Sequence, residues 1–350
     1  MDVAVVGWAQ TPMVRHTDQS ETQLLLRVIT DALTPLGLTR ADIDFTCLGS
    51  CDYITGQAFS FVSNLDAIGA WPPKRDSHVE MDGAWALYEA WVRLQHGDID
   101  SALVFSSGIS SRGDLREVLC LQNDPYYLMP LWADHVSLAA LQARALLDTG
   151  KVTEADLAEV VARSRRAAAG NPFAQVSGDA TAESLAAEPY VVSPLRAGDC
   201  PPVSDAAAAM VLVAGDRARD VCERPAWIRG IDHRIEPHYP GVRDLTTSES
   251  TRLAAQHVGV NDAPVEVAEV SATFSHEELI LRDALDLRDD VEVNPSGGAL
   301  AANPVMVTGL IRVGEAFRQI NEHGRSRTLG HATSGPCLQQ NLVCLLEAAR

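Results

Sequence analysis

The chain has 350 residues, of which 46% are hydrophobic and 21% are charged, proportions that exclude a disordered or fibrous protein. It carries 28 Lys and Arg against 47 Asp and Glu, which gives a formal net charge of −19. This acidic balance argues against partners such as nucleic acid or an anionic membrane surface, although a small anionic substrate needs only a local basic patch.

The sequence shows no signal for targeting, membrane insertion or metal binding. Residues 1–7 lack the basic segment of a signal peptide, and the purest apolar run, 206–214, is too short to span a bilayer. The seven cysteines are an odd number and no two have CxxC spacing. We therefore expect reduced thiols, no metal site and a cytoplasmic location.

The first third of the chain predicts alternating strands and helices. In chain order we expect a buried strand at 3–7, a helix at 19–36, a strand at 45–48, a helix at 82–96 ended by Gly97, and a strand at 102–105. Strand, helix and strand in this order predict βαβ units and a parallel sheet.

The middle of the chain differs in character. Residues from about 111 to 202 predict two helices, at 133–149 and 154–169, and little strand. The second helix carries Arg163, Arg165 and Arg166, the densest basic cluster in the chain. We interpret this segment as a helical excursion inserted into the α/β unit, which resumes with a buried strand at 207–213.

The last third repeats the first in kind. Strands are expected at 265–270 and 291–293, helices at 277–287 and 305–317, and two apolar runs near Leu329 and at 342–346 close the chain. Two βαβ-rich halves suggest an internal duplication. We place the first half at residues 1–225, including the helical excursion at about 111–202, and the second at 226–350.

Several motifs give the chain a family resemblance. The segment Asn294 to Leu300 (NPSGGAL), followed by Thr308-Gly309, resembles the thiolase superfamily. Similar stretches are VAVVGWAQTP at 3–12, RSRRAAAGNPFAQ at 163–175, PLRAGDCPPVSDAAAA at 194–209 and LQQN at 338–341, the last resembling the sterol-carrier-protein type of thiolase. Together they cover essentially the whole chain. The resemblance implies an α/β fold of two βαβαβ halves stacked in five layers, with an inserted helical loop domain and usually a dimer.

The chain departs from the pattern of these relatives at every chemical group of the thiolase reaction. Resembling thiolases carry a nucleophilic Cys at the start of a buried helix, three residues before a Gly, and Glu80 stands at that position here, with no Cys near it. The motif His, Asp, Cys, Phe of the sterol-carrier type falls on residues 271–274, so Ser271 and Thr273 replace the His and the Cys. The His-Pro pair falls on Asn303-Pro304.

Glu80 and Asp82 allow two interpretations. Carboxylates favour the N-terminus of a helix, where the helix dipole stabilises them, and a structural role accounts for both. Alternatively, Glu80 lies at the bottom of the former nucleophile pocket and transfers a proton, a role that needs a pKa raised by burial.

The other candidate site residues lie in the last third of the chain. His276 directly follows the segment that the resemblance places in the active site, and its imidazole suits acid–base chemistry, unless it is only a solvent-facing residue at a helix start. Ser271 and Thr273 can donate to a thioester oxygen or serve a turn. Asn303 retains an oxyanion donor where the relatives have a His. His331 suits a structural hydrogen bond more than catalysis.

The resemblance implies two functions of different class. Some thiolase-like proteins without the nucleophilic Cys are lyases that cleave β-hydroxyacyl-CoA thioesters by a retro-aldol reaction, notably in bacterial steroid side-chain breakdown. CoA is then part of the substrate and no separate cofactor is needed. The alternative is a non-catalytic subunit of a heteromeric complex, and ordinary acetyl-CoA acyltransferase activity is the least favoured.

The resemblance also suggests partners. Relatives of the lyase type often work with a small zinc-ribbon/OB-fold protein, which another chain would have to supply here. We further expect a homodimer, or a heterodimer with a thiolase-like paralogue, that associates through the first half near the strand at 102–105, because a sheet edge needs cover.

Overall fold

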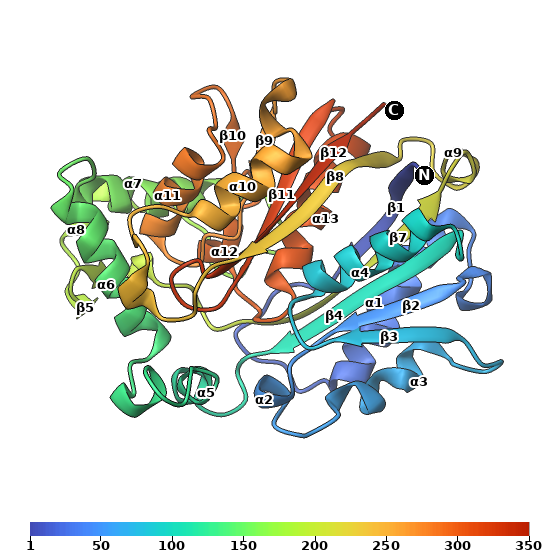
Figure 1. Ribbon diagram of the computed structural model, residues 1–350, viewed down its shortest axis with the longest axis horizontal. Helices are drawn as coiled ribbons and strands as arrows, with labels where there is room; N and C mark the ends of the chain where they lie inside the picture. Colours follow the sequence, from blue (N-terminus) through green and yellow to red (C-terminus); the bar gives the residue numbers. More distant parts are fainter. Residues whose placement is uncertain (350) are drawn as a thin grey trace.

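The structure is a computed structural model, and it describes residues 1–349. The strands of the first half are β1 (Val3–Gln10), β2 (Phe45–Gly49), β3 (Arg75–Val79), β4 (Ser101–Ile109) and β7 (Asp205–Ala214). Those of the second half are β8 (Ala226–Ile235), β9 (Val267–Glu269), β10 (Glu292–Val293), β11 (Arg327–Ser334) and β12 (Gln340–Glu347). All ten form one sheet in the order β10-β9-β11-β12-β8-β1-β7-β4-β2-β3 (Figure 1).

The two halves of this sheet repeat one topology. The order β3-β2-β4-β7-β1 recurs as β10-β9-β11-β12-β8. In each half the first three strands of that order are parallel to one another. The fourth strand is antiparallel to both of its neighbours, the third and the fifth. The predicted duplication is therefore confirmed, and so is the parallel pairing of the strands at 45–48 and 102–105. The strands β7, β1, β12 and β8, however, pair antiparallel with their neighbours. In the first half the long excursion after β4 returns the chain in the opposite direction, and in the second half β11 turns directly back into β12.

Helices cover both faces of each half of the sheet, which gives the five layers expected: helix, sheet, helix, sheet and helix. The long helices of the two halves are α1 (Glu21–Leu33), α4 (Gly83–His96), α10 (Glu249–Val258), α11 (Ser275–Ala284) and α13 (Thr308–Asn321). Helix α1 packs on the outer face of the first half and α10 on that of the second. Helices α4 and α13 contact each other and lie between the two halves of the sheet, where they share one hydrophobic core.

Strand β7 shows why these strands read as continuous apolar runs. Its alternate residues belong to two different cores: Met210 and Leu212 join the core around α4 and α13, whereas Val211 and Val213 join the core beneath α1. A strand covered by helices on both faces has no solvent side, so polar residues do not alternate along it.

The excursion between β4 and β7 is a helical lobe, drawn in green at the left of Figure 1. It consists of α5 (Leu115–Leu121), α6 (His135–Asp148), α7 (Glu154–Ala168), α8 (Ala182–Ala186) and a small hairpin of β5 (Tyr190–Val192) and β6 (Leu195–Arg196). The hairpin was not predicted because strands of two or three residues show no periodicity. Of the basic cluster of α7, Arg163 binds the buried Glu278.

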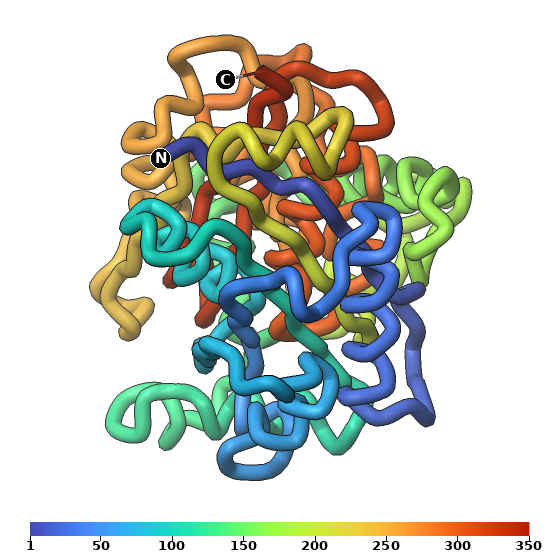
Figure 2. The backbone as a smooth tube through the Cα atoms, turned by 90° about the vertical axis from the view of Figure 1, so that its right-hand side faces the viewer, coloured from blue at the N-terminus to red at the C-terminus, as the bar shows by residue number. Residues whose placement is uncertain are grey.

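The remaining helices are short: α2 (Asp52–Thr55), α3 (Leu65–Ile68), α9 (Arg217–Val221) and α12 (Gly298–Ala301). Figures 1 and 2 together show that the start of β1 and the end of β12 lie on the same side of the molecule. Across residues 1–349, no helix combines the length and the apolar character needed to cross a membrane.

The predicted association surface needs a correction. Residues 102–105 lie in β4, which is paired on both sides, with β2 and β7, and so cannot be an edge. The open edge of the first half is β3, whose Arg75 and Asp76 are exposed.

Candidate functional site

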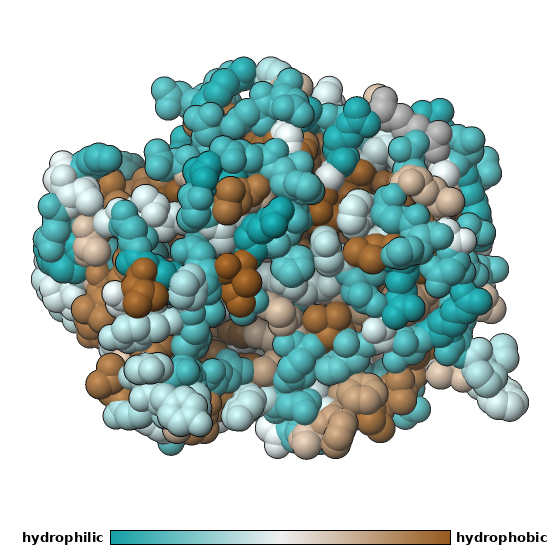
Figure 3. Space-filling model, viewed as in Figure 1, coloured by the Kyte–Doolittle hydropathy of each residue, from teal (hydrophilic) through white to brown (hydrophobic). Residues whose placement is uncertain are grey.

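A cavity of about 960 Å³ opens where the two halves meet the helical lobe. The first half contributes the ends of β2 and β3 and the start of α4, the lobe contributes α5 and α6, and the second half contributes the loop after β9 and the turn between β11 and β12. In Figure 3 hydrophobic residues border a hollow between the lobe and the two halves. The apolar side of the cavity comes from the lobe, for example from Leu115, Leu119, Met129 and Val136.

The cavity brings four of the six predicted site residues together. Glu80, Ser271, Thr273 and Asn303 line it, although the first and the other three come from different halves of the chain. His276 and His331 are not among the lining residues, and both are completely buried.

Asp82 lies at the start of α4 and joins the two central helices. Its carboxylate accepts the backbone N–H of Ala84 at 2.8 Å, and it also accepts those of Gly309 at 2.9 Å and Leu310 at 3.0 Å from the first turn of α13. Burial raises the pKa of Asp82, and the three donors act against that shift. The helix-start position with its concentrated N–H dipoles therefore belongs to Asp82, not to Glu80.

Glu80 follows β3 and is half exposed, with 47% of its side chain accessible. It accepts the backbone N–H of Asp52 at 2.6 Å and lies 3.6 Å from the imidazole of His78. It is therefore neither a cap of α4 nor buried. No Cys lies near Glu80 in the sequence, but the fold brings Cys51 to its side chain.

His276 points away from the cavity. Its Nε2 lies 3.2 Å from Oε1 of Gln142 on α6, and its Nδ1 is buried without a partner among the described residues. Burial lowers the pKa of His276 to about 3, so the imidazole is neutral at physiological pH. A general base must reach the proton that it removes, and this position does not offer that reach.

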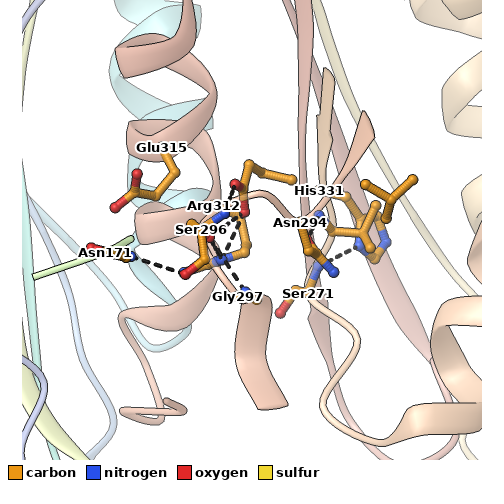
Figure 4. Close-up of polar contacts among 12 residues, drawn as sticks. Asn171, Ser271, Asn294, Ser296, Gly297, Arg312, Glu315 and His331 are labelled. Atoms are coloured by element: carbon orange, nitrogen blue, oxygen red, sulfur yellow. Dashed lines mark hydrogen bonds and ion pairs between the residues drawn. The ribbon is translucent and has the colours of Figure 1, made fainter. Parts of the chain in front are cut away.

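His331, on β11, holds the segment that carries Ser271 in place. Its Nδ1 accepts the backbone N–H of Ser271 at 3.3 Å, and its Nε2 donates to Oδ1 of Asn341 at 3.1 Å. Burial lowers its pKa to about 4. As Figure 4 shows, the hydroxyl of Ser271 points away from the His331 ring. Ser271 therefore lines the cavity with a free hydroxyl, while His331 fixes its backbone.

Asn303 also keeps a donor for a ligand. Its Oδ1 accepts the hydroxyl of Thr308 at 2.8 Å, and its backbone N–H donates to Ser204 at 3.0 Å. Because the carbonyl oxygen of the side chain is engaged, the amide N–H groups are the part of Asn303 that remains for a ligand in the cavity.

Glu277 is a carboxyl-bearing lining residue that the sequence did not single out as a site candidate. It is only 3% exposed, yet it borders the cavity from the first turn of α11. Thr273 donates both its N–H and its hydroxyl to Oε2 of Glu277, each at 2.8 Å, and Phe274 adds a third N–H at 3.1 Å. The available signal was the place of Glu277 at the third position of α11, where a carboxylate can reach back to the N–H groups that precede the helix.

Three cysteines line the cavity, and none is activated. Burial raises the pKa of Cys200 and of Cys337 to about 12, and it also raises that of Cys51. The nucleophilic form of a cysteine is the thiolate, so these groups are protonated and unreactive at neutral pH. Within residues 1–349 no three His, Cys, Asp or Glu side chains are grouped so that they could hold a metal ion.

The NPSGG segment lies outside the cavity lining and has a structural role. The carboxylate of Glu269 on β9 accepts the N–H and hydroxyl of Ser296, and Arg312 of α13 donates to both residues, at 2.8 and 2.6 Å (Figure 4). Asn171 of the lobe donates to the Ser296 carbonyl. Gly297 has φ +95°, and a Cβ there would lie 2.6 Å from Cβ of Ala168. The segment thus ties the second half to the lobe.

Comparisons with known proteins agree with this architecture. The acetyl-CoA acetyltransferase of Methanothermobacter thermautotrophicus is 25% identical over 366 aligned positions, which cover 95% of this chain and 94% of that protein. The 17-hydroxy-3-oxo-4-pregnene-20-carboxyl-CoA lyase of Mycobacterium tuberculosis is 25% identical over 67% of this chain and 63% of its own length. No family model matches the chain.

A solved structure described as "Ltp2-ChsH2(DUF35) aldolase" superposes with a TM-score of 0.83 and 22% identity, covering 100% of this chain and 98% of the matched one. The duplicated sheet, the layers of helices and the inserted lobe are thus features of a known fold. The chain is a homologue of thiolase-superfamily proteins and has the thiolase fold.

Proposed function

We propose that this chain is a lyase that cleaves the Cα–Cβ bond of a β-hydroxyacyl-CoA thioester by a retro-aldol reaction, without a covalent cysteine intermediate. The observation that carries this proposal is the occupation of the α4 start by Asp82. A thiolate would need those backbone N–H groups for its activation, and the Asp82 carboxylate already takes them. The protonated thiols around the cavity support the same conclusion.

The groups that line the cavity suit a retro-aldol cleavage. The reaction needs a base for the β-hydroxyl proton and donors for the negative charge that develops on the thioester oxygen. The free hydroxyl of Ser271 and the amide of Asn303 are the proposed donors. Of the bases named from the sequence, Glu80 borders the cavity and His276 does not.

The cavity also suits a bulky apolar acyl group. Its volume of about 960 Å³ lies at the upper end of the range for small-molecule sites, and the lobe provides apolar side chains along one wall. The mycobacterial relative is named for a steroid-derived CoA thioester. We therefore propose a steroid side-chain CoA thioester as the substrate.

The proposal is tested by incubating the purified chain with steroid side-chain β-hydroxyacyl-CoA esters, with and without a candidate zinc-ribbon/OB-fold partner protein. We expect a ketone or aldehyde and a shortened acyl-CoA in equal amounts. Activity that appears only with the partner and survives replacement of Ser271 and Asn303 would instead favour a non-catalytic subunit. The name of the structural neighbour, which joins two proteins, supports that alternative.

A second measurement separates the lyase from an acetyl-CoA acyltransferase. With acetoacetyl-CoA and CoA we expect no thiolysis, and intact-mass spectrometry is expected to show no acylated cysteine. Turnover together with an acyl group on Cys51, Cys200 or Cys337 would contradict the proposed chemistry.

A further inference from the structure

Glu277 is the buried carboxyl group of the second half that lacks a cationic partner. Glu269 pairs with Arg312 at 2.8 Å, and Glu278 pairs with Arg163. Glu277 is as buried as these two, yet no Lys, Arg or His in residues 1–349 forms an ion pair with it. Among these residues Asp82 is also buried without a cation, but backbone N–H groups engage both of its oxygens. Glu277 accepts hydrogen bonds through only one oxygen, so a role in the fold does not account for the other.

The two oxygens of Glu277 have different surroundings. Oε2 receives all three hydrogen bonds, from the N–H and hydroxyl of Thr273 and the N–H of Phe274. Oε1 has no hydrogen-bond partner in the described chain. It is not completely enclosed by protein atoms, and Glu277 borders the cavity. One oxygen is therefore fixed to the backbone and the other is presented to whatever occupies the cavity.

The elements packed around α11 place no competing charge against Glu277. On α6, burial lowers the pKa of His135 to about 4, so that ring is neutral at pH 7. On the turn between β11 and β12, burial keeps Cys337 protonated, and Glu277 adds to this effect while Arg243 opposes it. The buried Arg243 is engaged by the carbonyls of Pro336 and Cys337. Arg163 of α7 is engaged by Glu278, Asp199 accepts the hydroxyl of Ser275, and Glu249 and Arg252 of α10 pair with each other.

We propose that Glu277 is the catalytic residue that carries the proton in this cavity. The inference rests on the proposed retro-aldol function and assigns to it a base that the sequence did not identify. The free Oε1 is the atom that reaches the substrate, and Thr273 is the positioning residue that holds the carboxylate through Oε2.

The proton and electron balance closes with this one carboxyl group. Oε1 removes the proton from the β-hydroxyl, the oxygen lone pair forms the carbonyl of the leaving ketone or aldehyde, and the electron pair of the breaking Cα–Cβ bond enters the thioester enolate. The protonated Glu277 then delivers the same proton to Cα of the enolate. No oxidant, reductant or water is consumed, and the carboxylate is regenerated.

The ionisation of Glu277 suits both steps. Burial raises its pKa to about 7, because the hydrogen bonds from Thr273 and Phe274 offset only part of the desolvation. An acid–base group works best when its pKa lies near the working pH, where both of its forms are populated.

The test compares Glu277→Gln with the wild type in the assembled lyase. Gln keeps an oxygen for the Thr273 and Phe274 donors, so the variant is expected to fold with an unchanged Tm. We expect kcat to fall by about 10²–10⁴-fold with KM little changed. In the wild type we expect kcat/KM to rise with pH through an apparent pKa near 7, and Glu277→Asp is expected to retain this rise at reduced kcat. Glu117→Gln, the same substitution at an exposed position of α5 outside the cavity lining, is the matched control.

Two readouts separate this inference from the proposed function. A ¹³C-carboxyl NMR titration of the free protein is expected to show a group titrating near pH 7 that Glu277→Gln removes. Exchange of the Cα proton of a saturated acyl-CoA in D₂O is expected in the wild type and lost in Glu277→Gln. Exchange without cleavage of any β-hydroxyacyl-CoA would support Glu277 but contradict the lyase. Full exchange or cleavage in Glu277→Gln, or a wild type that does neither, would overturn the assignment of Glu277.

Discussion

The two halves of the molecule share a topology but do not cap their central helices in the same way. Helix α4 begins after Asp82, whose carboxylate accepts the N–H of Ala84 within the same half. Helix α13, its counterpart, begins after Val307, which has no side-chain cap. The N–H groups of Gly309 and Leu310 are instead satisfied by Asp82.

This difference shows that the duplication is no longer a pair of independent units. One carboxylate of the first half serves the helix starts of both, at the place where the cavity meets the central core. A residue that completes the hydrogen bonding of two helices cannot be replaced without affecting both halves.

The largest effect is expected for Asp82→Ala. It leaves up to three buried N–H groups without an acceptor, and each such group costs about 1–3 kcal/mol, so we expect the free energy of unfolding to fall by about 3–5 kcal/mol. Urea unfolding measures this loss. Asp114→Ala is the control, because Asp114 caps only its own exposed helix α5, and the loss of such a cap costs about 1 kcal/mol. Equal losses in the two variants would refute the shared cap.

A smaller effect is expected for Gly309→Ala. A Cβ on Gly309 would lie 2.4 Å from Cβ of Ala332 and 2.6 Å from Oδ1 of Asp82, so α13 would have to move away from β11 of its own half and from Asp82 of the other. We expect a loss of about 1–3 kcal/mol, typical of overpacking. Gly170→Ala, whose nearest neighbouring atom is 3.8 Å away, is the control and should change stability little.

The second half is expected to carry a pH dependence through its buried histidines. The pKa of His331 is about 4 in the fold against 6.5 for a free histidine, so the unfolded chain binds the proton first. The stability that neutral His331 contributes is thus complete above pH 6.5 and is lost as the pH falls towards about 4, by up to about 1.4 kcal/mol per pH unit.

Comparison with His331→Asn isolates this contribution. Buried carboxyl groups of raised pKa, such as Glu277, act in the opposite direction, but they are common to both proteins and cancel. We expect the wild type to be the more stable at pH 7, with an advantage that shrinks at pH 5 in guanidinium unfolding. An advantage that stays constant between the two pH values would show that His331 does not titrate as described.

The smallest effect on stability concerns the open edges of the halves. Strand β3 offers five residues at the edge of the first half, whereas β10 offers only two at the edge of the second. We expect a dimer through β3, and Ser77→Lys should dissociate it without loss of Tm, because like charges would face each other across the pair. Light scattering after gel filtration measures the mass, with the exposed Ser177→Lys as control. A monomeric wild type at micromolar concentration would exclude this association.

Much of the fold could be predicted because its signals are local. Strands buried on both faces appear as apolar runs, and α4 starts and ends where Asp82 and Gly97 indicate, with Gly97 at φ +74°. Strand direction could not be predicted in the same way. Whether β7 runs parallel or antiparallel to β4 depends on how the lobe returns the chain, which no local pattern records.

The candidate site was predicted only in part, for a related reason. His276 and Glu277 are neighbours in sequence, but successive residues of a helix point about 100° apart, so one faces Gln142 and the other the cavity. The sequence favours the imidazole, and only the packing of α11 distinguishes the two. The contact between Cys51 and Glu80 likewise depends on the adjacent ends of β2 and β3.

The place of β1 between the halves has a consequence for biosynthesis. Val3 pairs with Ala214, and Ala4 and Val5 pair with Trp227 and Ala226 to join the two halves of the sheet. A ribosome therefore releases this apolar strand long before either of its partners has been translated. Until then β1 is an unpaired edge with a tendency to aggregate, so the yield of native protein depends on how well the nascent chain is shielded during that interval.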